Sequence, residues 1–195
     1  MSKILYVCAI EQECIALSAV HSVDNLVTGI GKCNASYELT RHLCLSSDSY
    51  DLVLNIGTAG TLKFQVGDIL FCNQFVDRDL VKLKDYGLQY QTESLYKDVW
   101  PSFVNGRLIE DSFVANTGDD FVTSSEQIDG DVIDMEAYAL ASVCQRMNVP
   151  FVSVKYVTDV VGQNSLKHWE DKLADARKEL SDYFNHLKDY GFGKY

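Results

Sequence analysis

The stretch DVIDMEAYALASVCQRMNVPFVSVKYVTD, residues 131–159, holds two apolar, strand-like runs on either side of a helix-like segment. Strands that are apolar along their whole length and alternate with helices are typical of a sheet whose two faces are both covered. Both runs end in acids, with Asp134 and Glu136 at the first and Asp159 at the second. Because a carboxylate at the end of a buried strand is costly unless something binds it, this stretch predicts both a fold and a site.

The same alternation of strands and helices continues over the rest of the chain. We expect further strands near 3–10, 25–31, 50–60, 66–76 and 111–119, and helices at 32–45, 136–148 and 165–190. The least periodic segment, 84–112, is interpreted as a long loop, irregular or partly helical, near the site or an interface. Because only two prolines occur and no linker or repeat interrupts the chain, we expect one α/β domain over residues 1–195. Its architecture should be three α/β/α layers with a twisted mixed central sheet.

The charge balance limits the partners of this chain. Lys and Arg total 17 against 28 Asp and Glu, so the formal net charge is −11, and an acidic chain repels a phosphate backbone. No stretch of about 18 apolar residues predicts a membrane helix, and the first residues, MSKILYVCAIEQE, do not resemble a signal peptide. We therefore expect a cytoplasmic protein that binds a small molecule, without nucleic acid or membrane as a partner.

Six cysteines are spread widely along the chain, and several lie in apolar runs: Cys8, Cys14, Cys33, Cys44, Cys72 and Cys144. No C-x-x-C pair occurs, and the four histidines do not cluster near the cysteines. This pattern favours free, mostly buried thiols in a reducing compartment over a zinc site, and no metal site is expected.

Polar clusters follow several of the predicted strands, where ligands gather in sheets of this kind. Besides the three acids already named, these clusters are Glu11 and Glu13, TGIGK at 28–32, NIGTAG at 55–60 and TGDDF at 117–121. The glycines can serve tight turns, or they can let backbone N–H groups approach a ligand closely. Neither glycine cluster matches a dinucleotide-binding or P-loop motif.

The acids likewise have a structural and a functional interpretation. Glu11 and Glu13 can be solvated residues of a first helical turn, which we favour for Glu11. Glu136 and Asp159 can each cap a helix. If Glu13, Glu136 and Asp159 instead share one partly dry crevice, they can supply an acid and a base, or bind the hydroxyl groups of a polyhydroxylated ligand.

Together these motifs resemble the nucleoside phosphorylase/nucleosidase superfamily, and within it the methylthioadenosine/S-adenosylhomocysteine nucleosidases. The resemblance covers most of the chain, through AIEQE, TGIGK, VLNIGTAG, VGDI, VDRDLV and TGDDF to DMEAYALASVCQRMNVPF and VKYVTDV. DMEA followed by a strand and TDV about 20 residues later is its most specific part. The resemblance implies hydrolysis of the N-glycosidic bond of an adenosine-type nucleoside, without a metal or organic cofactor.

The resemblance also implies a role for each site residue. Glu13 would position and activate the attacking water, and Asp159 would protonate or hydrogen-bond N7 of the purine. Glu136 would hold the ribose hydroxyl groups, with Met135 beneath the sugar. The remaining predicted contacts are Phe121 and Val122 to the base, Thr58 and Gly60 at the floor of the pocket, and Ile10 and Trp169 to the 5′ substituent.

The nucleophile distinguishes a hydrolase from a phosphorylase. Phosphorylases of the superfamily present arginines to phosphate, whereas the corresponding stretches here, CAIEQEC and VLNIGTAG, contain none. Of the five arginines only Arg78 lies near a site motif, and Glu13 would repel phosphate, so water is favoured. A phosphate-dependent phosphorylase and a nucleoside-binding pseudoenzyme remain the alternatives. The resemblance further implies a homodimer, although the hairpin that usually precedes GIGK is missing here.

Overall fold

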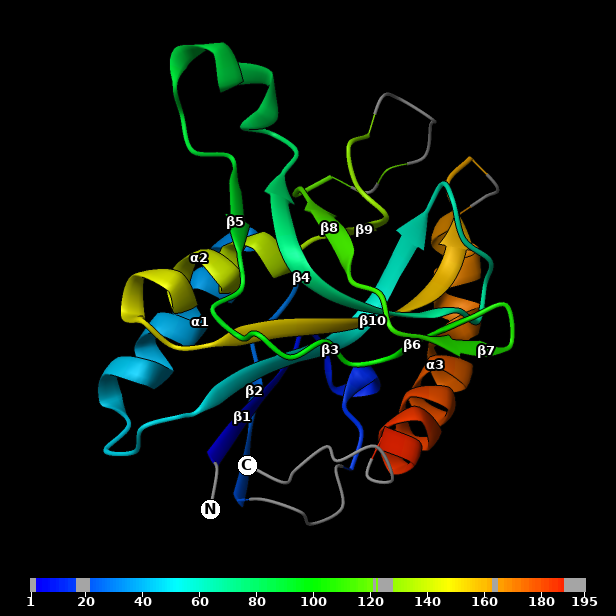
Figure 1. Ribbon diagram of the computed structural model, residues 1–195, viewed down its shortest axis with the longest axis horizontal. Coiled ribbons are helices and arrows are strands. Elements are labelled where there is room, and N and C mark those ends of the chain that lie inside the picture. The colour runs from blue at the N-terminus through cyan, green and yellow to red at the C-terminus, as the bar shows by residue number, and fades with distance from the viewer. Residues whose placement is uncertain (1–2, 17–21, 121, 123–127, 163–164, 188–195) are drawn as a thin grey trace.

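The computed structural model describes residues 3–16, 22–120, 122, 128–162 and 165–187 (Figure 1). Their strands are β1 (Lys3–Cys8), β2 (Ser22–Val27), β3 (Leu52–Thr61), β4 (Ile69–Asp77), β5 (Gln91–Glu93), β6 (Ser102–Val104), β7 (Arg107–Ile109), β8 (Phe113–Thr117), β9 (Val132–Asp134) and β10 (Phe151–Val160). Their helices are α1 (Lys32–Leu45), α2 (Ala137–Met147) and α3 (Ser165–Leu187), with 3-10 turns η1 (Glu11–Glu13) and η2 (Val81–Tyr86).

The strands form one mixed sheet, as predicted, in which part of the sheet closes on itself. β1 lies between β2 and β3, parallel to both, and β10 runs parallel to β3 on the other side. β10 also pairs with β4, β4 with β8, β8 with β9, and β9 returns to the end of β3. β3, β10, β4, β8 and β9 therefore make a closed ring of strands, and closure leaves these five with neighbours on both sides.

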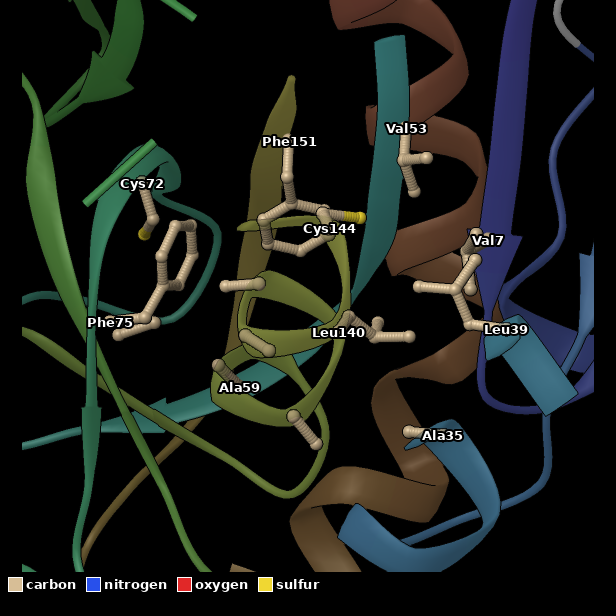
Figure 2. Close-up of a cluster of buried hydrophobic side chains, with 14 of the residues drawn as sticks. Val7, Ala35, Leu39, Val53, Ala59, Cys72, Phe75, Leu140, Cys144 and Phe151 are labelled. Carbon is tan, nitrogen blue, oxygen red and sulfur yellow. The ribbon is translucent and has the colours of Figure 1, made fainter. Parts of the chain in front are cut away.

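Helices cover both faces of the sheet, which confirms the layered α/β prediction. α1 and α2 lie together on one side and α3 lies on the other (Figure 1). On the first side Leu39 of α1 and Leu140 of α2 pack with strand residues such as Val53, and Figure 2 shows this cluster. On the second side Leu180 and Phe184 of α3 pack against the other face of β1, β3 and β10. The near-continuous apolar strands are explained by burial on both faces.

One sequence-based expectation about the sheet was wrong. The segment 84–112 is not one long loop, because β5, β6 and β7 form within it and β5 and β6 pair with β4. The strand expected near 50–60 is confirmed as β3, which runs through NIGTAG to Thr61 and pairs there with β10 and β9. The tight turn, one of the two interpretations of its glycines, is therefore not formed.

The expectation that all six cysteines are free, mostly buried thiols was also wrong. Cys8, the last residue of β1, forms a disulfide with Cys14, which follows η1. The short turn between them brings their Cα atoms to 6.0 Å, within the range for a disulfide. Cys33 and Cys44 are free and exposed, and only Cys72 and Cys144 fit the buried-thiol prediction.

No helix among the described residues is long and apolar enough to cross a membrane.

Candidate active site

One pocket of about 170 Å³ lies beside the ends of β1, β3, β9 and β10, with α3 at its edge. The structure brings nine of the ten predicted site residues to its wall: Ile10, Glu13, Thr58, Gly60, Val122, Met135, Glu136, Asp159 and Trp169. The tenth, Phe121, lies outside the described residues. These residues come from six separate stretches of chain, so their convergence is a property of the fold.

Glu13 is held by the strand opposite it. Its carboxylate is buried, and Oε1 accepts a hydrogen bond from the Thr58 backbone N–H (2.9 Å) and another from the Thr58 hydroxyl (2.6 Å). Gly57 leaves room for this carboxylate, since a Cβ there would lie 3.3 Å from both its oxygens. Glu11, two residues earlier, is exposed, as predicted.

Asp159 does not cap a helix but lies near the end of β10. The register between β10 and β3 shifts between Val157 and Asp159, and such a bulge re-aims the side chains beside it. The Thr158 hydroxyl lies 2.8 Å from Asp159 Oδ1. Asp159 Oδ2 sits so close to β3 that a Cβ on Gly60 would come within 2.9 Å of it. The bulge and the glycine together allow the carboxyl group to face the pocket.

Glu136 occupies the N-cap position of α2, but its side chain does not cap that helix. Instead its Oε1 accepts a 2.8 Å hydrogen bond from the backbone N–H of Gly31, immediately before α1. Gly31 has φ +94°, a conformation that favours glycine, so the TGIGK turn does bring a backbone N–H to the site. Burial, with the negative charge of Asp134 nearby, raises the pKa of Glu136 to about 7.

Asp134, in the pocket wall, forms a buried ion pair with Lys155, a residue that the sequence analysis missed. Its Oδ2 lies 2.8 Å from Lys155 Nζ and accepts from the Ala137 N–H, while Oδ1 accepts from the Thr117 hydroxyl. Burial alone would lower the pKa of Lys155, but Asp134 and Glu136 hold it above its ordinary value, so Lys155 is charged. A lone lysine in an apolar strand was the signal that could have revealed this pair.

The structure adds further wall residues to which the sequence analysis gave no role: Ala9, Ile30, Ala59, Asp120, Ile133, Asp134 and Val161. All lie within two residues of a predicted site residue or in the TGIGK and TGDDF motifs. The apolar ones give the pocket a mostly apolar lining around a few acids, which is the usual composition of a small-molecule site.

Arg78, the one arginine near a site motif, does not line this pocket. Its Nη1 donates to Asn116 Oδ1 (3.0 Å), and its Nη2 pairs with Asp120 Oδ1 (2.9 Å). Its side chain is largely buried by these contacts. No group of three or more potential metal ligands occurs among the described residues.

Comparison with known proteins identifies the family. The model of the Phosphorylase superfamily matches residues 110–188. Over 180 residues the chain is 31% identical to the 5′-methylthioadenosine/S-adenosylhomocysteine nucleosidase of Anoxybacillus flavithermus, covering 80% of this chain and 76% of that one. The chain belongs to the methylthioadenosine/S-adenosylhomocysteine nucleosidase family. The nucleosidase of Marinomonas sp. is 29% identical over 178 residues, with the same coverage.

Solved structures of this nucleosidase family share the fold. The Helicobacter pylori nucleosidase, bound to butyl-thio-DADMe-Immucillin-A, superposes with a TM-score of 0.74 at 17% identity, covering 97% of this chain and 99% of that one. Futalosine hydrolase from the same organism gives the same TM-score at 16% identity, covering 97% of this chain and 98% of that one. These likenesses show that the chain has the fold of both structures.

Proposed function

We propose that this protein is a purine nucleosidase that hydrolyses the N-glycosidic bond of an adenosine-type nucleoside, 5′-methylthioadenosine or S-adenosylhomocysteine. The observation that carries the proposal is the convergence of Glu13, Glu136 and Asp159 on one mostly apolar pocket. Family membership supports the same reaction, because the relatives are named as nucleosidases for these two compounds.

The reaction explains why the pocket needs three carboxyl groups. Cleavage of the bond gives the sugar oxocarbenium character, as in glycoside hydrolysis, and a nearby carboxylate stabilises that charge. The purine is a poor leaving group as an anion, so a proton supplied at N7 by Asp159 lowers the barrier. Glu136 accepts hydrogen bonds from the ribose hydroxyl groups, and Glu13 takes a proton from the attacking water.

The surroundings of the pocket favour water over phosphate as the nucleophile. In the part of the chain that the structure describes, no arginine, Arg78 included, lines the pocket, and buried Glu13 would repel an anion. A phosphorylase remains the second candidate because the superfamily contains both activities.

The test is release of adenine from methylthioadenosine by the purified protein, with and without phosphate, beside Asp159→Asn. We expect release without phosphate, reduced at least about 100-fold in the variant, as for loss of a general acid. Release only with phosphate would replace the hydrolase by a phosphorylase. Binding of methylthioadenosine without release under either condition would indicate a nucleoside-binding pseudoenzyme.

We also propose that the protein is a cytoplasmic homodimer. The support is an exposed surface over α1 and α2 that includes the large side chains of Tyr37 and Leu45. Exposed apolar side chains beside each other are common at interfaces between subunits. Sedimentation equilibrium should give twice the chain mass, and Tyr37→Glu with Leu45→Glu should give the monomer.

A further inference from the structure

We propose that Trp169 and Thr58 form a hydrogen-bond relay that orients Glu13 as the base toward water, a positioning role that rests on the proposed hydrolysis. The relay joins α3, β3 and η1, three elements that are far apart in the sequence. It assigns Trp169 a polar role in addition to the apolar contact predicted for it.

The contacts run in one line from the helix to the carboxylate. Trp169 Nε1 lies 2.8 Å from Thr58 Oγ1, and Thr58 Oγ1 lies 2.6 Å from Glu13 Oε1. The backbone N–H of Thr58 reaches the same Oε1 at 2.9 Å. Thr58 and Glu13 are buried and Trp169 is half-buried, so water competes weakly for these bonds.

The chemistry of the three groups gives the relay a direction. An indole N–H can only donate, and a threonine hydroxyl carries one hydrogen. While Trp169 donates to the Thr58 oxygen, the hydroxyl hydrogen is left for Glu13. Glu13 Oε1 then receives two donors, which fix the orientation of the carboxylate.

The second carboxylate oxygen is left for the reaction. Among the described residues no donor makes a hydrogen bond to Glu13 Oε2, although Glu13 lines the pocket. A base needs such an oxygen within reach of the proton that it removes. The indole nitrogen is the atom of Trp169 that takes part in the relay. Phenylalanine at this position would keep an aromatic ring but lack the donor.

The chain offers a matched set of variants for the test. Trp169→Phe removes the first donor, Thr58→Val removes the hydroxyl at nearly constant shape, and Thr58→Ser keeps the hydroxyl. We expect kcat for adenine release to fall about 10- to 100-fold in Thr58→Val, the range for losing a hydrogen bond to a charged group. In Trp169→Phe kcat should fall several-fold. In Thr58→Ser kcat should remain within about threefold of the wild-type value.

The split between kcat and KM separates positioning from general structural damage. If the relay orients Glu13, Thr58→Val and Trp169→Phe should lower kcat without raising KM, and Thr58→Ser should restore kcat. A loss of packing that disturbs the whole pocket would raise KM as well. An unchanged kcat in Thr58→Val, in an active wild-type background, would overturn the proposal.

A measurement without substrate tests the relay independently of the proposed function. The chain has two tryptophans, so ¹H–¹⁵N spectra should show two indole signals, and Trp169→Phe identifies the one from Trp169. Thr58→Val should shift that signal, while the signal of Trp100, whose Nε1 lies 3.3 Å from Tyr96 Oη, should stay. If wild type releases no adenine but the Trp169 signal shifts, the proposed function fails and the relay stands. If the signal does not shift, the relay fails.

Discussion

Two glycines of β3 lie against site carboxyl groups, and Gly60 leaves Asp159 less room than Gly57 leaves Glu13. A Cβ at Gly60 would approach Asp159 Oδ2 to 2.9 Å, closer than real Cβ atoms come, whereas one at Gly57 would lie at 3.3 Å from the Glu13 oxygens. The two glycines therefore serve two different acids, and they differ in how much room each leaves.

We predict that Gly60→Ala displaces Asp159 and lowers kcat for adenine release by at least about tenfold, as small displacements at a reacting centre do. Gly57→Ala should have a smaller effect, because Glu13 needs to move by only a few tenths of an ångström to make room for the added Cβ. Steady-state kinetics measures kcat for the two variants, and circular dichroism checks that both are folded. Equal effects from the two variants, or none from Gly60→Ala, would contradict this account of the contact.

Glu136 should make the stability of the free protein depend on pH. Its pKa is raised to about 7 by burial and by Asp134, so between its ordinary value near 4.5 and 7 the folded state binds more protons than the unfolded state. The free energy of unfolding should therefore fall as the pH rises through this window, by up to about 3 kcal/mol at about 1.4 kcal/mol per pKa unit.

Urea unfolding between pH 4.5 and 8, in wild type and Glu136→Gln, measures this contribution. Glutamine mimics the protonated side chain and should remove this part of the slope. Glu179→Gln, at an exposed position of α3, is the matched control and should leave the slope unchanged. Identical slopes in wild type and Glu136→Gln would show that Glu136 does not titrate in this window.

Among the elements, the helices followed most directly from local sequence. α1 runs over Lys32–Leu45, the predicted 32–45, and α2 spans Ala137–Met147 within the predicted 136–148. α3 begins at 165 as predicted and is described to Leu187. Helices depend on contacts a few residues apart, so their periodicity is visible in the sequence. The short strands divide into two cases. β5 pairs with the distant β4, which no local pattern predicts, whereas β6 and β7 form a hairpin across Asn105 and Gly106, a local signal that the sequence analysis did not use.

At the scale of one element, the disulfide should stabilise the turn that carries Glu13. Cys8 and Cys14 close a short loop over Ala9–Glu13, and closing a loop of this length contributes about 2 kcal/mol in the chain-entropy model. Cys14→Ser, or dithiothreitol added to wild type, should lower the free energy of unfolding by about that amount. Cys33→Ser, at an exposed free cysteine, is the control for Cys14→Ser and should have the same free energy of unfolding as wild type before reduction. No change on reduction would mean that the turn is held by its other contacts.

At the scale of the whole molecule, the closed ring of β3, β10, β4, β8 and β9 contains a buried charge pair. Lys155 of β10 and Asp134 of β9 are both almost fully buried, and they connect strands that are not neighbours in the sheet. A buried pair is not by itself stabilising, but removing one partner leaves the other charge uncompensated.

We predict that Lys155→Met lowers the free energy of unfolding by about 3–5 kcal/mol, the range for breaking a buried ion pair. Lys178→Met breaks ion pairs on the exposed face of α3 and should have a far smaller effect. Adding Asp134→Asn to Lys155→Met should recover part of the loss. A double variant less stable than Lys155→Met would show that Asp134 matters for its bonds to Thr117 and Ala137 more than for the pair.

The sequence by itself determined the α/β class, the three helices, most strands and the carboxylates at strand ends, because these depend on local periodicity and on residue types that are costly to bury. It also carried the family motifs, from which nine residues of the pocket wall were predicted. Only the tertiary structure decided the closure of the ring, the Cys8–Cys14 pairing and the partners of Glu13, Glu136 and Lys155. Each of these is a contact between segments far apart in the chain or across a turn of unknown geometry, and neither spacing nor composition specifies which distant groups meet.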